Sequence, residues 1–173
     1  MEENTTIAAI ATGAGGGVGI VRLSGPRAVA IAGEIFVPQD PKKRVEALPG
    51  YSCTLGRAVD GERTLDQALL LLFRGPKSYT GEDVAELSCH GGRVVLEEVL
   101  SLAVRHGAVP AARGEFTKRA FLNEKLSLTQ AESVADIVAA QSVQGLRAAQ
   151  TVREGALQRA VDQVCADLTA AAA

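Results

Sequence analysis

The sequence predicts a mixed α/β domain followed by the first helices of an all-α bundle. Short runs rich in β-branched residues alternate with glycine- and proline-containing turns over roughly the first two thirds of the chain. Beyond residue 116 the apolar residues recur only at helical spacing. With 47% hydrophobic residues and a net charge of −2, a globular core is expected rather than disorder. We therefore divide the chain into an α/β domain at 1–116 and the start of a helical domain at 117–173.

The first domain is expected to contain several short strands and two helices. Pro26 suits the first turn of a helix because its missing N–H needs no partner there. Gly107 suits the end of a helix, and the Asp60-Gly61 step is typical of a hairpin turn. The predicted elements are, in order, strands at 7–12 and 19–24, a helix at 28–36, a strand pair at 51–59 and 66–73, a strand at 83–88, a helix that follows Gly91-Gly92, and a strand at 109–112.

The second domain is predicted to begin with two helices. Ser127 and Gln130 have the spacing of a capping box, so a helix is expected to start there. A second helix is predicted from about Gln144 to Ala171, with apolar residues along one side over roughly 40 Å. Such a side must be buried against a partner. We therefore expect a helical bundle that is incomplete in this chain, as in a piece of a longer protein.

The sequence has no signal for secretion or membrane insertion. Its N-terminus is acidic, and no run reaches the ~18 apolar residues of a membrane span. We expect a cytoplasmic protein that does not associate with a membrane. Cys53, Cys89 and Cys165 form no CxxC pair, so each is expected to be a small buried apolar residue rather than a metal ligand.

The glycine cluster between residues 13 and 19 does not have the spacing of a nucleotide-binding loop. A dinucleotide fingerprint needs glycines at i, i+2 and i+5, and a P-loop needs Gly-Lys followed by Ser or Thr; neither pattern occurs. We therefore predict no GTP or ATP site in this chain. A tight connection between two strands is the favoured interpretation, and close approach of the backbone to a ligand is the second.

His90 and His106 are the two histidines of the chain. His106 lies at a predicted helix end, where a cation interacts favourably with the helix dipole, so a structural role is expected. For His90 a hydrogen bond to loop backbone is the commoner role, and a general base is the alternative. Because adjacent strand residues point to opposite faces, Cys89 and His90 are not expected to form a nucleophile pair.

Two charged residues interrupt apolar strands and are the candidate site residues. Arg22 shares a strand face with Ile20 and Ser24, and Glu86 shares one with Val84 and Ser88. A charge on a half-buried strand needs a partner. Either the two residues pair with each other or face water, or they bind a polar ligand that offers donors to one and acceptors to the other. The residues alone leave these alternatives open.

Several separated motifs resemble the N-terminal domain of the MnmE (TrmE) family, the bacterial tRNA-modification GTPases. The segment that leads into the second domain, Gly-Glu-Phe-Thr-Lys-Arg-Ala-Phe-Leu-Asn-Glu-Lys-Leu, is the most specific of them. The motifs occur in the family's order and cover nearly the whole chain. They lie at residues 6–12, 16–25, 78–87, 90–92 and 114–126, with Gln-Ala-Glu at 130–132.

The resemblance implies a function and partners. Proteins of this family act with a flavin-dependent partner, MnmG (GidA), to install an aminomethyl-type group on C5 of the wobble uridine of tRNA. The carbon comes from a tetrahydrofolate, 5-formyl- or 5,10-methylene-, which binds the N-terminal domain; that domain also forms the homodimer. The GTPase domain, with GTP and its Mg and K ions, is expected to lie outside this chain.

The resemblance also implies a fold and site residues. The domain is expected to be similar to the folate domain of the glycine-cleavage T-protein. The family's folate-contacting arginine, glutamate and lysine fall on Arg22, Glu86 and Lys125. No catalytic residue or metal ligand is expected. The alternatives are a free-standing folate-dependent one-carbon transferase, for which the chain offers no convincing acid or base, and a purely structural dimerisation module.

Overall fold

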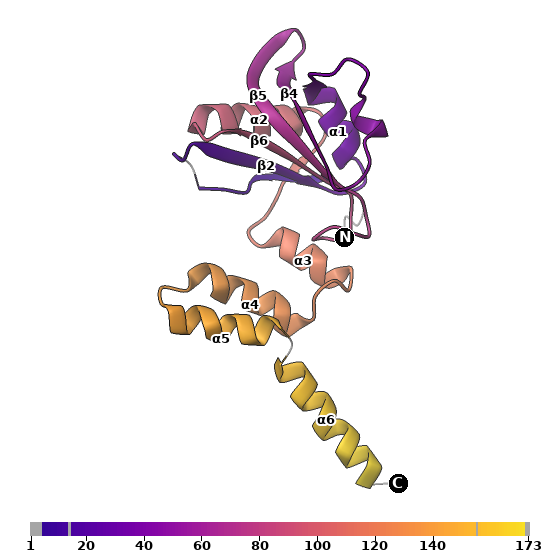
Figure 1. Cartoon of the computed structure of the whole chain (residues 1–173), viewed down its shortest axis with the longest axis vertical. Coiled ribbons are helices and arrows are strands. Elements are labelled where there is room, and N and C mark those ends of the chain that lie inside the picture. The colour runs from indigo at the N-terminus through magenta and orange to yellow at the C-terminus, as the bar shows by residue number, and fades with distance from the viewer. Residues whose placement is uncertain (1–4, 14, 155, 172–173) are drawn as a thin grey trace. The chain divides into compact units, whose positions relative to one another are not determined.

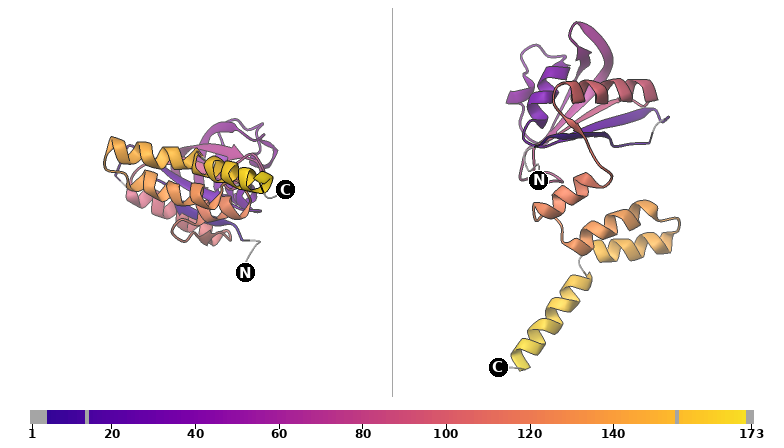
Figure 2. Two further views of the ribbon diagram at one scale, coloured as in Figure 1. Left: turned by 90° about the horizontal axis from the view of Figure 1, so that it is seen from below. Right: turned by 180° about the vertical axis from the view of Figure 1, so that it is seen from behind.

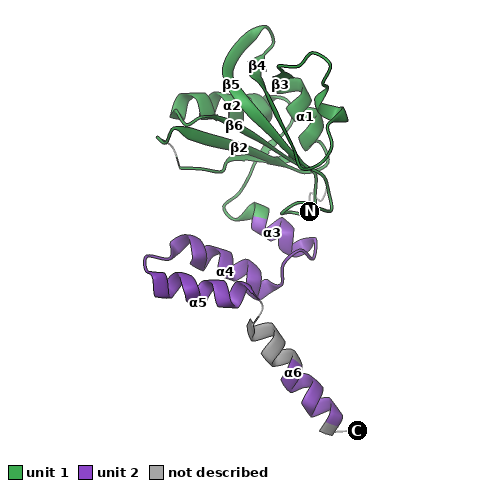
Figure 3. Cartoon of the chain, in the orientation of Figure 1, with its two compact units in different colours: residues 1–116 green, residues 117–173 purple. Residues whose placement is uncertain are grey.

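The computed structural model describes residues 5–13, 15–154 and 156–171. It divides into two compact units, residues 1–116 and 117–173, which are described separately below (Figure 3). The first unit contains the sheet, and the second contains helices.

Unit 1 is built on one seven-stranded sheet in the order β3-β4-β5-β6-β2-β1-β7 (Figure 1). β1 and β7 run parallel, and every other neighbouring pair is antiparallel, so the sheet is mixed, as predicted. The strands are β1 (Ile7–Ile10), β2 (Val18–Ser24), β3 (Phe36–Pro38), β4 (Ser52–Asp60), β5 (Arg63–Phe73), β6 (Val84–His90) and β7 (Val109–Pro110).

Helices α1 (Ala28–Ile35) and α2 (Arg93–Arg105) bury one face of this sheet. Alternate strand residues such as Val21, Leu70 and Leu87 are fully buried and share one core cluster with both helices. The view from behind in Figure 2 shows α2 lying across the sheet. Because successive strand residues alternate between faces, Arg22 and Glu86 belong to the other face, which we call the second face of the sheet.

Close packing explains two of the glycines in unit 1. A Cβ atom on Gly19 would lie 2.5 Å from a methyl carbon of Leu96, so glycine lets α2 approach β2. Gly107 has a φ of 100° directly after the C-cap residue His106, as expected for the left-handed residue that ends a helix. His106 Nδ1 also lies 2.5 Å from Glu34 of α1, so the predicted structural role of this histidine is confirmed.

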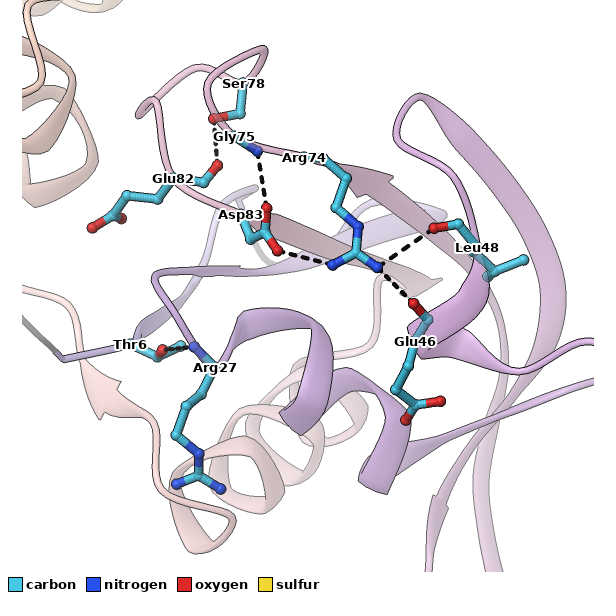
Figure 4. A network of polar contacts seen from close by, with 9 residues as sticks. All are labelled: Thr6, Arg27, Glu46, Leu48, Arg74, Gly75, Ser78, Glu82 and Asp83. Carbon is cyan, nitrogen blue, oxygen red and sulfur yellow. Dashed lines mark hydrogen bonds and ion pairs between the residues drawn. The ribbon is translucent and has the colours of Figure 1, made fainter.

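A clip of polar contacts joins the segment after β5 to the segment before β4 (Figure 4). Arg74 donates to Asp83 Oδ2 at 2.9 Å and to the backbone carbonyl of Glu46 at 2.8 Å. Asp83 also accepts the backbone N–H of Gly75 at 2.9 Å. Glu46 belongs to the 3-10 helix η1 (Val45–Ala47), so one arginine holds two irregular segments in place.

Unit 2 consists of α4 (Leu128–Ala139), α5 (Val143–Arg153), α6 (Ala156–Ala171) and most of α3 (Glu115–Leu122). α4 begins with the predicted capping box, in which the Ser127 side chain accepts from the Gln130 N–H and the Gln130 side chain accepts from the Ser127 N–H. α4 and α5 pack side by side.

Several predictions about elements were wrong. The helix expected from Gln144 to Ala171 is two helices, because α5 ends at Arg153, just before Gly155, and glycine is a poor helix former. Residue 155 itself lies outside the described residues. The helix expected to reach Phe36 ends at Ile35, because Phe36 begins an edge strand, β3. That strand, η1 and α3 were not predicted, since short elements have weak local patterns.

The cysteine prediction was correct only for Cys89. Cys89 is 3% exposed and belongs to the core, whereas Cys53 and Cys165 are exposed. Cys53 lies on β4, on the face that α1 and α2 do not cover, and small size alone does not determine which face a strand residue occupies. Among the helices that the structure describes, none combines the length and apolar character needed to cross a membrane.

Candidate functional site

Arg22 and Glu86 lie directly opposite each other on neighbouring strands. β2 and β6 pair antiparallel, and their register aligns Arg22 with Glu86 although 64 residues separate them. The same row of the second face continues to Leu71 on β5, which aligns with Glu86, and to Ala9 on β1, which aligns with Arg22. The two charges are therefore flanked by apolar side chains.

The two residues form an ion pair through a single hydrogen bond. Arg22 Nε donates to Glu86 Oε1 at 2.6 Å. The Arg22 side chain is 31% exposed and the Glu86 side chain 13% exposed, so the pair is only partly shielded from water. Pairing between these residues was one of the alternatives that the sequence left open, and the structure contains it.

Among the residues that the structure describes, the ion pair leaves part of each charged group without a protein partner. Within the described residues, the two Nη atoms of Arg22 take part in no hydrogen bond, and neither does Glu86 Oε2. A guanidinium has five N–H donors, and a carboxylate has about four acceptor positions. The pair therefore presents donors and an acceptor next to each other on the second face of the sheet, which suits binding of a polar, planar group.

Phe116 is a further member of the site that the sequence did not suggest. The Arg22 guanidinium carbon lies over the Phe116 ring, 5.5 Å from its centroid, which is within cation–π range. Phe116 is half-buried and lies in the first turn of α3. An aromatic residue inside the most family-specific motif was the available signal, but no local pattern relates it to a strand residue so distant in sequence.

The segment after β5 covers the second face next to the ion pair. Ser24, two residues from Arg22 on β2, is fully buried and donates to Glu82 Oε2 at 2.6 Å. Its oxygen lies 2.7 Å from Thr80 Oγ1, and Thr80 is fully buried as well. Because a hydroxyl has one proton and the carboxylate only accepts, Thr80 donates to Ser24. This network fixes one border of the site.

Lys125, the third predicted site residue, lies in unit 2. It follows Glu124, which has a left-handed φ of 56°, and its backbone N–H donates to the carbonyl of Ala120 at 2.8 Å. Lys125 lines an open cavity of about 590 Å³ between α3 and α4, together with Phe121, Leu122, Glu124, Leu126, Ser127 and Gln130. The structure thus joins Arg22 and Glu86 within unit 1 and places Lys125 beside a cavity in the other unit.

His90 contacts a carboxylate rather than loop backbone, so the favoured prediction for its ring was wrong. Its backbone N–H donates to Asp66 Oδ2 and its Nδ1 lies 2.7 Å from Asp66 Oδ1. Its side chain is 71% exposed, whereas Cys89 is buried, so the expectation that the two point to opposite faces is confirmed. Burial, with a smaller contribution from Asp66, raises the pKa of the Cys89 thiol from 9.0 to about 12.

The glycine-rich segment packs against the start of α2. The N–H of Gly15 donates to the carbonyl of Gly91 at 3.1 Å, and the N–H of Gly91 donates to Gly17 at 3.3 Å. A Cβ atom on Gly91 would lie 2.1 Å from the carbonyl oxygen of Gly16. Among the described residues, no group of three or more His, Cys, Asp or Glu side chains is placed to hold a metal ion.

Comparison with known proteins gives the family. The family profile described as GTP-binding protein TrmE N-terminus matches residues 6–125, a range that contains Arg22, Glu86, Phe116 and Lys125. The chain belongs to the TrmE N-terminal family. The resemblance drawn from the sequence motifs is thereby confirmed.

Relatives of this TrmE N-terminal chain are described as tRNA modification GTPase MnmE. The protein of Symbiobacterium thermophilum is 47% identical over 161 residues, which is 92% of this chain and 35% of the relative. That of Nitratidesulfovibrio vulgaris is 46% identical over 171 residues, or 98% of this chain and 37% of the relative. That of Bacteroides fragilis is 44% identical over 154 residues, or 89% and 33%. The chain thus spans about a third of the length of these relatives.

Proposed function

We propose that the α/β unit binds a reduced folate, 5-formyl-tetrahydrofolate or 5,10-methylene-tetrahydrofolate, at the Arg22–Glu86 pair. The observation that carries the proposal is the incomplete pairing of these two groups, which leaves the Arg22 Nη donors and Glu86 Oε2 available on one sheet face. A pterin edge has adjacent N–H donors and a carbonyl acceptor, so it matches such a combination. Charge-assisted hydrogen bonds of this kind are roughly twice as strong as neutral ones.

Lys125 would contribute through the other end of the ligand. A folate tail carries carboxylates, and a lysine ammonium is a flexible cation with three donors. No proton transfer is assigned to Arg22, Glu86 or Lys125. In this proposal the α/β unit binds the one-carbon donor, and the chemical steps require the whole protein. The expected similarity to the T-protein folate domain is part of the same proposal.

Membership of the family supports a proposal for the wider role. We infer that the chain works as part of a tRNA modification GTPase that forms a homodimer through its α/β unit. Its partners would be the flavoprotein MnmG (GidA) and, through that complex, a tRNA whose wobble uridine is modified at C5. GTP, with Mg and K ions, would bind a GTPase domain of the same protein rather than the α/β unit.

Calorimetric titration with 5-formyl-tetrahydrofolate tests the site. Glu86→Gln keeps the shape of the side chain but removes its charge and replaces one acceptor by a donor. We expect affinity to fall by about ten- to a hundredfold, the equivalent of roughly 1.5–3 kcal/mol. Glu97→Gln is the matched control, because Glu97 pairs with Arg93 on the exposed side of α2. The affinity of the Glu97→Gln variant for 5-formyl-tetrahydrofolate should equal that of the unaltered chain.

A purely internal ion pair predicts a different result for the same variant. Glu86→Gln would then lower the melting temperature, since it leaves Arg22 without its partner, and would leave folate affinity unchanged. Unchanged affinity would therefore rule out Glu86 as a ligand-binding residue. Lys125→Ala should cost less than Glu86→Gln, because its expected partner is an exposed tail carboxylate, and its effect should shrink in high salt.

A further inference from the structure

The Phe116 ring is the second fixed contact of the Arg22 guanidinium. We propose that Phe116 is a positioning residue, which holds Arg22 so that its Nη donors lie beside Glu86 Oε2 and face the ligand. The inference rests on the proposed function of the Arg22–Glu86 pair. It concerns a residue that touches the arginine rather than the folate, and it predicts how the affinity of the site depends on an aromatic ring outside the sheet.

One hydrogen bond does not fix a guanidinium. Arginine has a long side chain with many rotamers, and the bond from Nε to Glu86 constrains it at one atom only. Rotation about that contact would move both Nη atoms. The Phe116 ring, 5.5 Å from the guanidinium carbon, restricts this motion because it gives the cation a preferred position over its face.

The backbone that carries Phe116 is itself held within unit 1. Glu115, the preceding residue, accepts the backbone N–H of Ala112 at 2.6 Å through its carboxylate. Its own N–H donates to the carbonyl of Ala112 at 3.1 Å, so the turn before Phe116 is closed by two hydrogen bonds. A ring attached to a fixed turn can orient a flexible side chain, whereas a ring on a loose segment would move with it.

The arrangement separates two tasks within the site. Glu86 fixes the position of Arg22 Nε, and the Phe116 ring fixes the orientation of the guanidinium. The Nη donors therefore already have their binding position in the free protein. Preorganisation of this kind raises affinity because less side-chain freedom is lost on binding. The expected effect of removing the ring is a weaker ligand complex with little change in the folded state.

A double-mutant cycle on the 173-residue chain tests this inference by titration with 5-formyl-tetrahydrofolate. Phe116→Leu should weaken binding by about two- to fivefold, the range typical of an exposed cation–π contact. Phe116→Tyr, which keeps the ring face, should restore the affinity of the unaltered chain. In the Arg22→Gln background, Phe116→Leu should have no further effect, because the arginine through which Phe116 acts is gone. Phe73→Leu is the control, since the Phe73 ring contacts Tyr51.

The outcomes separate this inference from the proposed function. If the unaltered chain does not bind the folate, the proposed function and the inference fail together. If it binds and Phe116→Leu binds equally well, or if the effects of Phe116→Leu and Arg22→Gln add, only the inference fails. Because the chain has no tryptophan, Phe116→Trp also reports the contact without ligand. Its emission should change when Arg22→Gln is added, and identical emission would overturn the positioning role.

Discussion

Arg74 should stabilise the α/β unit through its polar contacts with Asp83 and Glu46. We predict that Arg74→Met lowers the free energy of unfolding by about 2 kcal/mol. Its bond to Asp83 is charge-assisted, and such bonds contribute ~1.5–3 kcal/mol. The two side chains are 34% and 30% exposed, so the lower end of that range applies. The 2.8 Å bond to the Glu46 carbonyl adds about 1 kcal/mol, and methionine recovers part of the loss by packing its apolar chain.

Urea unfolding followed by tyrosine fluorescence measures this loss in unit 1 alone. The chain has two tyrosines and no tryptophan, and both Tyr51 and Tyr79 lie in residues 1–116. Arg63→Met is the matched control. Arg63 Nη1 lies 3.7 Å from Glu98 Oε2, and the side chains of this pair are more exposed than those of Arg74 and Asp83. We expect it to cost less than ~0.5 kcal/mol. If Arg74→Met were no more destabilising than Arg63→Met, the clip between the two loop segments would not stabilise the fold.

Further predictions concern three positions, Cys89, Gly91 and Ser127. Because the pKa of Cys89 is raised from 9.0 to about 12, its thiol should resist Ellman's reagent at pH 8 until the chain is unfolded, while the two exposed thiols react at once. The folded chain keeps the Cys89 proton up to a higher pH than the unfolded chain does. The free energy of unfolding should therefore decrease between about pH 9 and 12, by up to ~1.4 kcal/mol per pH unit, and Cys89→Ala should remove this contribution to the pH dependence. Gly91→Ala should destabilise unit 1 by ~1–3 kcal/mol in urea titrations because of the clash with Gly16. Gly17→Ala, whose Cβ would meet nothing within 4 Å, should be nearly neutral, and equal effects of the two substitutions would contradict the packing argument. Ser127→Ala should lower helix stability by about 1 kcal/mol in circular dichroism melts, and Ser127→Thr should not; similar melts for both would argue against the capping box.

Local features of the fold could be predicted from the sequence, because short-range chemistry determines them. The capping box at Ser127 and the glycine end of α2 at Gly107 each depend on residues within one helical turn. The prediction of one helix from Gln144 to Ala171 was wrong. The apolar stripe in the sequence continues past Gly155, whereas α5 ends at Arg153. Hydrophobic periodicity predicts which side of a helix is apolar, but it does not predict whether the helix is continuous.

The candidate site could be predicted only in part. Alternation placed Arg22 and Glu86 each on a strand face, but their partnership depends on which strands are neighbours. Besides its sequence neighbour β1, β2 pairs with β6, which is distant in sequence. The Phe116 contact depends in addition on the path of the chain after β7. Lys125 came from the family resemblance alone, since nothing in its local sequence distinguishes it from a solvated lysine.

The strand order β4-β5-β6-β2 implies a sequence of events during folding. β4, β5 and β6 are consecutive along the chain, so their pairing closes short loops, whereas pairing of β2 with β6 joins residues 64 positions apart. Closing a longer loop costs more chain entropy before any contact offsets it. We expect the β4–β6 meander to form in the folding transition state and β2 to dock later. Gly61→Ala, in the β4–β5 turn, should then slow folding, while Val21→Ala on β2 should mainly accelerate unfolding, as two stopped-flow chevron plots would reveal.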